Sequence, residues 1–346
     1  MAVETALSDM DANTDERTIR SRFKMFLNKY HYIKEKETQS MNKKTCDSDA
    51  TCQTCESTEK CSQEEKEMHD QKLIEKNMAQ VRHKFMVLSG KGGVGKSSVA
   101  VNLAATLSTL GYDVGILDAD IHGPNVPKML GLDFERPHGS ENGMLPVLTP
   151  DNLRVMSIGF FLRHEDDAII WRGPLKHSLL KQFFGEVYWG DLDYLVMDLP
   201  PGTGDEPLSI AYLIKKVDGA IIVTTPQDVA LLDSRKSINF CKELKIPLIT
   251  VVENMSGMVC PHCQKEIDLF KVGGGEAIAA QMKIPFLGRI PLDPQMVVCT
   301  DDGRPFVNCY PESPVSNAFT SIAEKWIQML DGVNKKSSFA AGLFKK

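Results

Sequence analysis

The 346-residue chain has no apolar run long enough to cross a bilayer, and Met1 to Asp15 lack the apolar core of a secretion signal. It has no excess of basic residues, since its formal net charge is −6, and it has no internal repeat. These absences argue against nucleic acid and against an anionic membrane as partners. They favour a protein of the reducing cytoplasm that binds small ligands or other proteins.

The chain divides by composition into three predicted parts. Residues 1–82 are hydrophilic and predict a weakly structured N-terminal extension that contains a group of cysteines. Residues 83–333 predict the main domain, and residues 334–346 predict a flexible basic tail. Within the extension, the charged segment 62–83 fits either a helix or a solvated connector, and the connector is favoured.

Short apolar runs alternate with helix-length segments through the main domain. The first run, Phe85–Leu88, ends in a glycine-rich loop and is followed by apolar residues at helical spacing. The later runs are Val114–Leu117, Tyr194–Met197, Ala220–Val223, Leu248–Val252 and Phe286–Ile290, and a closing helix is expected over Pro314–Leu330. This alternation predicts an α/β fold with a mainly parallel sheet covered by helices on both faces.

The loop after the first strand matches the phosphate-binding pattern G-x-x-x-x-G-K-[ST]. Its residues, with the serine that follows, are Gly90, Lys91, Gly92, Gly93, Val94, Gly95, Lys96, Ser97 and Ser98. Backbone N–H groups of such a loop surround phosphate oxygens, Lys96 reaches the β- and γ-phosphates, and Ser97 is expected to ligate Mg²⁺. A plain glycine turn is the alternative, but a strand before the loop and a helix after it favour a P-loop that binds ATP.

Three polar residues at predicted strand ends complete the expected nucleotide site. Asp120 and Asp198 follow two of the strands, at the edge where open α/β sheets bind ligands. Asp198 is predicted to hold the Mg²⁺ shell and Asp120 to position the attacking water, although a lone aspartate at a strand end is more often a helix cap. Asn254 is predicted to contact the adenine edge, and a turn-forming asparagine is the alternative.

Six of the nine cysteines are grouped, which in a reducing compartment indicates metal binding. Four stand in the extension and two farther on: Cys46, Cys52, Cys55, Cys61, Cys260 and Cys263. The first group supplies four thiolates within one chain, enough for a [4Fe–4S] cluster or for Zn²⁺. The pair is two ligands short of a [4Fe–4S] cluster, so a second copy across a two-fold axis is the simplest completion. A Zn²⁺ ion shared by the two copies and a pair without metal are the alternatives.

Five motifs in order resemble the Mrp/ApbC family of iron–sulfur cluster carrier ATPases, over Lys84 to about Leu330. They are Gly90–Ser97, Asp118–Pro124, Trp171–Pro174, Asp198–Asp205 and Glu253–Gly257. The early lysine of the P-loop, Lys91, also resembles the MinD/ParA class, in which it reaches the nucleotide of a partner across a homodimer.

The family resemblance implies a slow ATPase, with Lys91, Lys96, Asp120 and Asp198 in catalysis, that assembles or delivers [4Fe–4S] clusters to apoproteins. It implies one cluster in each N-terminal cysteine set and one bridging the dimer at Cys260 and Cys263. A related subunit replacing one copy stays open. The extension resembles that of the cytosolic scaffold branch, except that Cys46 lies only five residues before Cys52, which leaves the fourth ligand open.

Two other functions fit parts of the pattern. An electron-transfer ATPase similar to the nitrogenase iron protein also needs a bridging cluster, but no cysteine lies between Cys61 and Cys241, where such a protein has a ligand near its second switch. A zinc-stabilised switch of the MinD/ParA kind, which positions or regulates partners, is the alternative. It calls for a membrane-seeking helix or a basic face, and the sequence shows neither.

Overall fold

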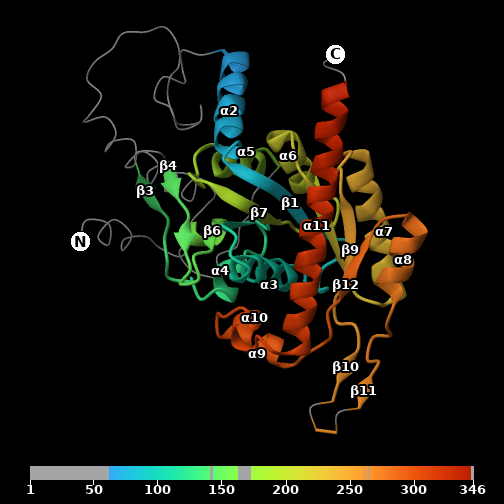
Figure 1. Ribbon diagram of the computed structural model, residues 1–346. Coiled ribbons are helices and arrows are strands. Elements are labelled where there is room, and N and C mark those ends of the chain that lie inside the picture. Colours follow the sequence, from blue (N-terminus) through green and yellow to red (C-terminus); the bar gives the residue numbers. More distant parts are fainter. Residues whose placement is uncertain (1–61, 141–142, 163–172, 261, 264, 344–346) are drawn as a thin grey trace.

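The protein is built around one eight-stranded sheet, seen in the computed structural model, which describes residues 62–140, 143–162, 173–260, 262–263 and 265–343 (Figure 1). The strand order is β12-β9-β8-β1-β7-β2-β6-β5, and neighbours run parallel except β5, which is antiparallel to β6. The strands are β1 (Val81–Ser89), β2 (Val114–Asp118), β5 (Val147–Leu148), β6 (Arg154–Ser157), β7 (Leu192–Asp198), β8 (Gly219–Thr224), β9 (Ile249–Glu253) and β12 (Phe286–Arg289). The predicted α/β fold is confirmed.

Helices cover the sheet in groups, because each parallel connection must cross over it. Helix α3 packs against α11, α5 packs against α2 and α6, and α7 packs against α8 (Figure 1). The helices are α2 (Gln63–Met78), α3 (Lys96–Thr109), α4 (Val126–Met129), η2 (Ile158–Phe161), α5 (Gly173–Gly185), α6 (Asp205–Ile214), α7 (Asp228–Glu243), α8 (Gly274–Met282), α9 (Gln295–Asp301), α10 (Phe306–Cys309) and α11 (Pro314–Leu343). None of those in the described ranges is long and apolar enough to cross a membrane.

Two small antiparallel ribbons stand apart from the main sheet. One pairs β3 (His138–Ser140) with β4 (Gly143–Leu145), and the other pairs β10 (Met258–Val259) with β11 (Glu266–Ile267). The second ribbon projects away from the body of the molecule and carries the predicted cysteine pair at its tip (Figure 1).

The central strands form the core between the helix layers. Phe85 of β1 is fully buried, and its ring lies 5.0 Å from that of Trp326 on α11. A Cβ at Gly219 would lie 2.4 Å from the Trp326 ring, so only glycine lets α11 approach the sheet this closely. Burying a phenylalanine side chain contributes about 1.5–3 kcal/mol, so these contacts fix the sheet on which the site residues stand.

Strand β1 begins four residues earlier than its apolar run suggested. His83 and Lys84 are buried, which hid the strand from the hydrophobic pattern. The ammonium of Lys84 donates to the carbonyls of Met78 at 3.1 Å and Val81 at 2.7 Å, and its backbone N–H donates to the Asp218 carboxylate at 2.9 Å. Satisfied hydrogen bonds thus allow a lysine inside the sheet.

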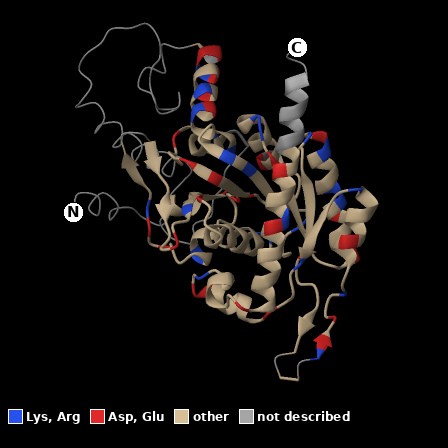
Figure 2. Cartoon of the chain, viewed as in Figure 1, with Lys and Arg blue, Asp and Glu red and all other residues tan. Residues whose placement is uncertain are grey.

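Segment 62–83, for which a solvated connector was favoured, forms helix α2 and the start of β1 instead. Ser62 and Glu65 form a capping box at its start, and Ile74 and Met78 belong to the core. Figure 2 shows charges of both signs along α2, which explains why its buried face was hard to see in the sequence. At the other end α11 continues to Leu343, past the boundary set at 333, because no proline interrupts it.

Candidate nucleotide site and cysteine hairpin

The glycine-rich loop connects β1 to α3, as its motif requires. Gly93 and Gly95 have positive φ angles of 80° and 77°, which other residues rarely adopt. A Cβ at Gly95 would also lie 2.3 Å from Nδ2 of Asn254. Gly92 and Gly93 face open space, and Lys91 beside them is partly exposed. The loop therefore has an open concave side bounded by the start of α3, where backbone N–H groups bind anions.

An ion pair lies at the base of this loop. The Lys96 ammonium lies 2.5 Å from Oδ1 of Asp198 and 3.1 Å from Oγ of Ser97, and the side chains of Lys96 and Asp198 are 7% and 1% exposed. The other oxygen of Asp198, Oδ2, is buried and has no hydrogen-bond partner among the described residues. The structure therefore brings together three of the predicted site residues around a buried carboxylate oxygen for which the described residues supply no hydrogen-bond donor.

A second carboxylate, which the sequence did not single out, adjoins Asp198 in the sheet. Asp118 pairs in register with Asp198 and is fully buried. It accepts hydrogen bonds from the backbone N–H groups of Asp120 and Val126, both at 3.2 Å, and from the Ser157 hydroxyl at 3.0 Å. Burial and then the negative charge of Asp198 raise the pKa of Asp118 to about 8. Asp118 thus anchors the loop that carries Asp120.

Asp120 itself lies at the edge of the site. Its Oδ1 accepts from the backbone N–H of Gly123 at 3.3 Å. Burial raises the pKa of Asp120, and the nearby Lys96 ammonium opposes that rise. The carboxylate is only partly buried, so it is accessible to a water molecule on the open side of the P-loop.

Three further polar side chains lie between the loops of the site, and sequence reasoning missed them. The Lys176 ammonium on α5 lies 2.6 Å from Oε1 of Glu206 on α6 and 2.6 Å from Nε2 of His122. Lys176 and Glu206 are mostly buried. His122 follows Asp120, and Glu206 follows the glycine-rich segment after Asp198, so Lys176 bridges the two. Only their position beside these motifs could have indicated them.

Asn254 lies beside the P-loop. Its side-chain amide donates to the Val94 carbonyl at 2.9 Å, and its backbone N–H donates to the Thr224 carbonyl. A pocket of about 170 Å³ opens next to it. Its lining includes Gly95, Ser98, Asn254, Met255, Pro291, Asp293 and Met296. Mixed polar and apolar walls next to a phosphate loop suit a nucleotide base.

Cys260 and Cys263 occupy the turn of the β10–β11 ribbon. Cys260 is partly exposed and Cys263 exposed. Hydrogen bonds from the backbone N–H groups of Cys263 and His262, and then from the Cys263 thiol, lower the pKa of Cys260. The turn thus favours a thiolate, the form that binds metals. Within the described part of the chain no three potential ligands cluster; Cys46, Cys52, Cys55 and Cys61 lie outside it.

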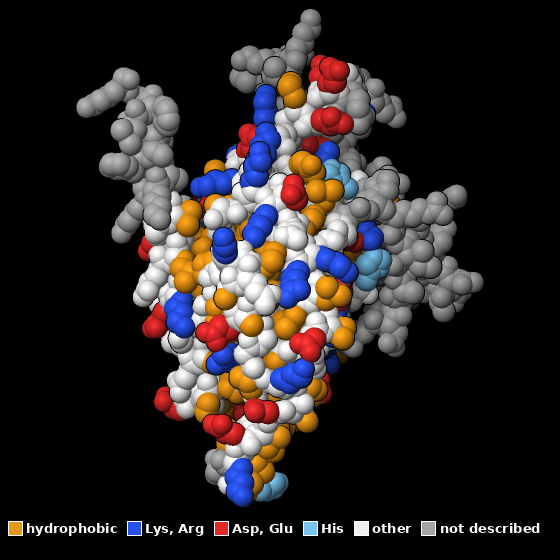
Figure 3. Space-filling view, turned by 90° about the vertical axis from the view of Figure 1, so that its right-hand side faces the viewer, with side chains coloured by type: hydrophobic (Ala, Val, Ile, Leu, Met, Phe, Trp, Pro, Cys, Tyr) orange, Lys and Arg blue, Asp and Glu red, His pale blue; other side chains and the backbone are white. Residues whose placement is uncertain are grey.

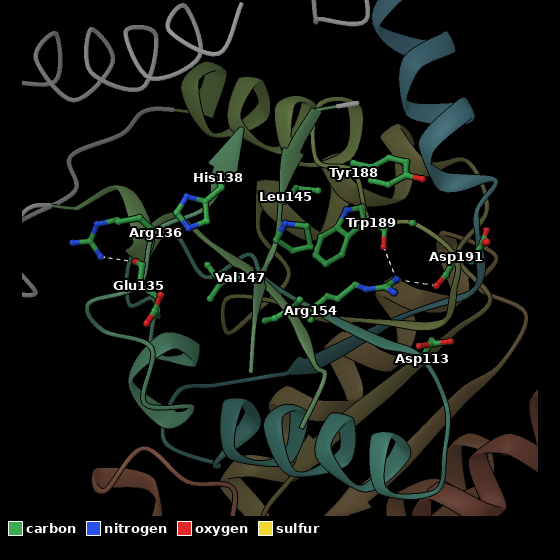
Figure 4. Close-up of a pocket in the computed structure, with 13 residues that line it drawn as sticks. Asp113, Glu135, Arg136, His138, Leu145, Val147, Arg154, Tyr188, Trp189 and Asp191 are labelled. Carbon is green, nitrogen blue, oxygen red and sulfur yellow. Dashed lines mark hydrogen bonds between the residues drawn. The ribbon is translucent and has the colours of Figure 1, made fainter. Parts of the chain in front are cut away.

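A larger cavity of about 600 Å³ lies at the β5–β6 edge and contains none of the predicted site residues (Figure 4). Arg154 crosses it and donates to the carbonyls of Trp189 at 2.7 Å and Asp191 at 2.8 Å. With its guanidinium engaged in this way, Arg154 holds the loop between α5 and β7 against β6.

The parallel sheet, the P-loop at the end of β1 and the acidic strand ends define the chain as a P-loop NTPase. The family model described as NUBPL iron-transfer P-loop NTPase matches residues 80–327. The chain belongs to this family.

Comparisons with individual proteins agree. An iron–sulfur cluster carrier protein of Methanocaldococcus jannaschii is 47% identical over 285 residues, 82% of this chain and 98% of that protein. The structure of a nucleotide-binding protein from Archaeoglobus fulgidus, solved with ADP, is 38% identical with a TM-score of 0.61, covering 68% of this chain and 91% of that one. The cell division ATPase MinD of Pyrococcus furiosus shares the fold, with a TM-score of 0.53 at 23% identity over 72% of this chain and 99% of that one.

Proposed function

We propose that this protein is an ATP-hydrolysing carrier that assembles or delivers [4Fe–4S] clusters to apoproteins. One observation carries the proposal: the same domain joins a P-loop with a buried Lys96–Asp198 pair to a projecting hairpin that presents two thiols. The family and the M. jannaschii carrier support the cargo, and the A. fulgidus neighbour supports the nucleotide.

In the proposed nucleotide site, Gly90 to Ser98 surround the phosphates and Lys96 binds the β- and γ-phosphates. The unpartnered Oδ2 of Asp198 and the nearby hydroxyl of Ser97 are oxygen ligands of the type that suits Mg²⁺, which would neutralise phosphate charge during transfer. Asp120 positions the attacking water. The pocket beside Asn254 takes the adenine.

The cysteine hairpin is proposed to hold its cluster between two copies of the chain. A [4Fe–4S] cluster takes four thiolates, and Cys260 and Cys263 supply two. A second copy across a two-fold axis supplies the others. Because both thiols stand at an exposed turn, the cluster would remain accessible to an acceptor apoprotein.

The dimer is also supported by the surface next to the P-loop. On α7, Val229 is 69% and Leu232 is 57% exposed, and a Cβ at Gly90 would meet the α7 backbone at Asp233, so this helix runs directly beside the loop. Figure 3 shows hydrophobic side chains between scattered charges on this side and along the projecting hairpin. Burial of these side chains by a second copy would bring Lys91 toward the partner's nucleotide. A related subunit would serve equally as the second copy.

The remaining parts of the proposal concern the extension and the setting. Each N-terminal set of Cys46, Cys52, Cys55 and Cys61 is proposed to hold a further [4Fe–4S] cluster, in the segment that precedes α2. Hydrolysis is expected to be slow, as in P-loop switches without an activator in trans. The cytoplasm is proposed as its setting, because clustered thiols that serve metals persist in reducing compartments.

The test is anaerobic reconstitution with iron and sulfide, followed by iron and zinc counts and Mössbauer spectra. The variants are Cys260→Ala/Cys263→Ala and Cys52→Ala/Cys55→Ala, with Cys241→Ala as the control for a buried cysteine outside both sets. Three cubane clusters per dimer, about twelve iron atoms, are expected in the wild type, with a separate fraction lost in each double variant. Tightly bound zinc without cluster formation would instead establish the zinc-stabilised switch.

A further inference from the structure

One buried carboxylate, that of Glu253, holds both ends of the cysteine hairpin. Glu253 ends β9 and is fully buried. Its Oε1 accepts from the Ser256 hydroxyl, just before the hairpin, and from the Gly273 N–H at 2.8 Å, just after it. Its Oε2 accepts from the Gly275 N–H at the start of α8. The 257–272 insert is thus fastened at both ends to a single side chain.

Glu253 directly precedes Asn254, a residue of the proposed nucleotide site, in the chain. Asn254 is the residue that binds the P-loop carbonyl of Val94 and, with Met255, lines the proposed base pocket. The backbone carbonyl of Glu253 accepts from the Ile290 N–H at 2.8 Å, which ties the segment to the end of β12. A displacement of Asn254 on nucleotide binding would therefore move the anchor of both hairpin ends together.

Backbone geometry at the hairpin ends suits a hinge. Met255 and Gly257, at the outgoing end, have φ angles of 55° and 73°. Lys271 and Gly273, at the returning end, have φ angles of 68° and 92°. A left-handed conformation is unfavourable for methionine and lysine, and it persists where surrounding contacts impose it. Each end thus has two left-handed residues, separated by one other residue, at which a small change in the anchor alters the direction of the chain.

The other attachments of the returning end are weaker. The Lys271–Asp228 ion pair is 2.9 Å long, but its side chains are 69% and 82% exposed, and exposed pairs hold little. Arg289 lies 3.7 Å from Oε1 of Glu253 and offsets its charge from the solvent side, where it also pairs with Glu276. At the outgoing end, the Ser256 N–H donates to the Ile290 carbonyl at 3.0 Å, and the Leu292 N–H donates to the Gly257 carbonyl at 2.8 Å. Glu253 is therefore the one side chain, among the described residues, whose hydrogen bonds join the two ends of the hairpin to each other.

We infer that Glu253 is a positioning residue that transmits the nucleotide state of the P-loop to the cysteine hairpin, and so sets how exposed Cys260 and Cys263 are to a metal cluster or acceptor. The inference rests on the proposed function, because it names the residue through which ATP would control the cargo site. It needs no cluster to be bound, since the link runs through the protein alone.

The experiment measures thiol alkylation in the full, reduced, metal-free chain. The rate at Cys260 and Cys263 is followed by mass spectrometry on the peptide that carries both, without nucleotide, with Mg·ADP and with a non-hydrolysable ATP analogue. The first variant is Glu253→Gln, which keeps the size but replaces one acceptor with a donor. The second is Ser256→Ala, which removes the bond between the outgoing end and Glu253, leaves the backbone bonds of that end in place, and keeps the test valid if Glu253→Gln misfolds. Glu276→Gln makes the same change on an exposed carboxylate at the start of α8. Nucleotide affinity is measured for each.

In the wild type and in Glu276→Gln, the rate is expected to differ about fivefold or more between nucleotide states, the lower range of allosteric coupling. In Glu253→Gln and Ser256→Ala nucleotide should still bind, while the difference falls below about twofold. A wild-type response in both variants would overturn the role of Glu253 and leave the proposed carrier function standing. No response to nucleotide in the wild type would overturn the inference whatever the cluster content, and the reconstitution experiment would still decide the proposed carrier function.

Discussion

The buried Lys96–Asp198 pair predicts how the nucleotide-free protein responds to Asp198→Asn. The ammonium and Oδ1 are 2.5 Å apart and almost fully buried. Removing one partner from such a pair costs about 3–5 kcal/mol, because the other charge stays buried without compensation. Asp118 moderates the loss: without the Asp198 charge its own pKa falls, so it ionises more readily beside Lys96. We therefore expect a loss of about 3 kcal/mol, or roughly 6–12 °C in Tm for a domain of this size.

The assay is thermal unfolding of the nucleotide-free full chain. Asp228→Asn is the matched control, since it breaks an ion pair of 2.9 Å whose side chains are exposed, and such pairs contribute about 0–1 kcal/mol. Adding ADP should narrow the gap between Asp198→Asn and wild type, because phosphate replaces the carboxylate as the partner of Lys96. If Asp198→Asn loses no more stability than Asp228→Asn, Lys96 is not held by Asp198 and the reasoning is refuted.

Other residues of the site give three further predictions. Burial raises the pKa of Asp118 to about 8, so its contribution to stability is lost as pH rises from about 4 to about 8. The stability of Asp118→Asn should therefore increase relative to that of the wild type across this range, by up to roughly 1.4 kcal/mol per pH unit, and the difference should level off above it. A difference in Tm between the two proteins that does not change with pH would contradict this prediction. Lys176→Met should lower the kcat of ATP hydrolysis about tenfold or more, and Lys176→Arg should restore part of it. Lys181 is on the same helix but pairs with Asp70 at 3.5 Å, so Lys181→Met should lose stability without losing kcat. Equal kcat values for Lys176→Met and the wild type would refute the role of Lys176 as a bridge. Gly95→Ala should weaken ADP binding about a hundredfold, because its Cβ would lie 2.3 Å from the Asn254 side chain and φ at this position is 77°. Calorimetry measures the affinity. Wild-type affinity in this variant would show that the loop rearranges to accept the added methyl group.

The sequence predicted those parts of the site that lie within one motif. The P-loop is contiguous, so its pattern contains nearly all of its geometry, and Asp198 follows an unmistakable apolar strand. Asp118 and Lys176 could not be recognised in this way. The role of Asp118 depends on a register pairing with Asp198 across neighbouring strands, and that of Lys176 on the meeting of α5 and α6 with the loop after β2.

The fold could be predicted because most of its strands are contiguous apolar segments. Errors arose where polar or charged residues are buried, or where charged residues hide a buried face. Parallel strands buried on both faces appear as continuous apolar runs, and six of them were found. β1 was shortened because Lys84 is buried behind hydrogen bonds, and the short strands β5 and β6 were missed because two to four residues give no periodic signal. α2 was disfavoured because its charges conceal the side that carries Ile74 and Met78.

The cysteine pair shows why a carrier would place its cluster on a hairpin rather than in the core. In the proposed dimer, two thiols at an exposed turn would leave half of the coordination of a [4Fe–4S] cluster to a second copy, so the bound state would depend on how the two copies meet. The P-loop lies beside α7 with its exposed Val229 and Leu232, so ATP and the dimer would share one surface. Glu253 binds both ends of the hairpin and directly precedes Asn254, which binds the P-loop. An arrangement of this kind allows hydrolysis to change the fit between two copies and thereby release a cluster that neither copy can hold alone.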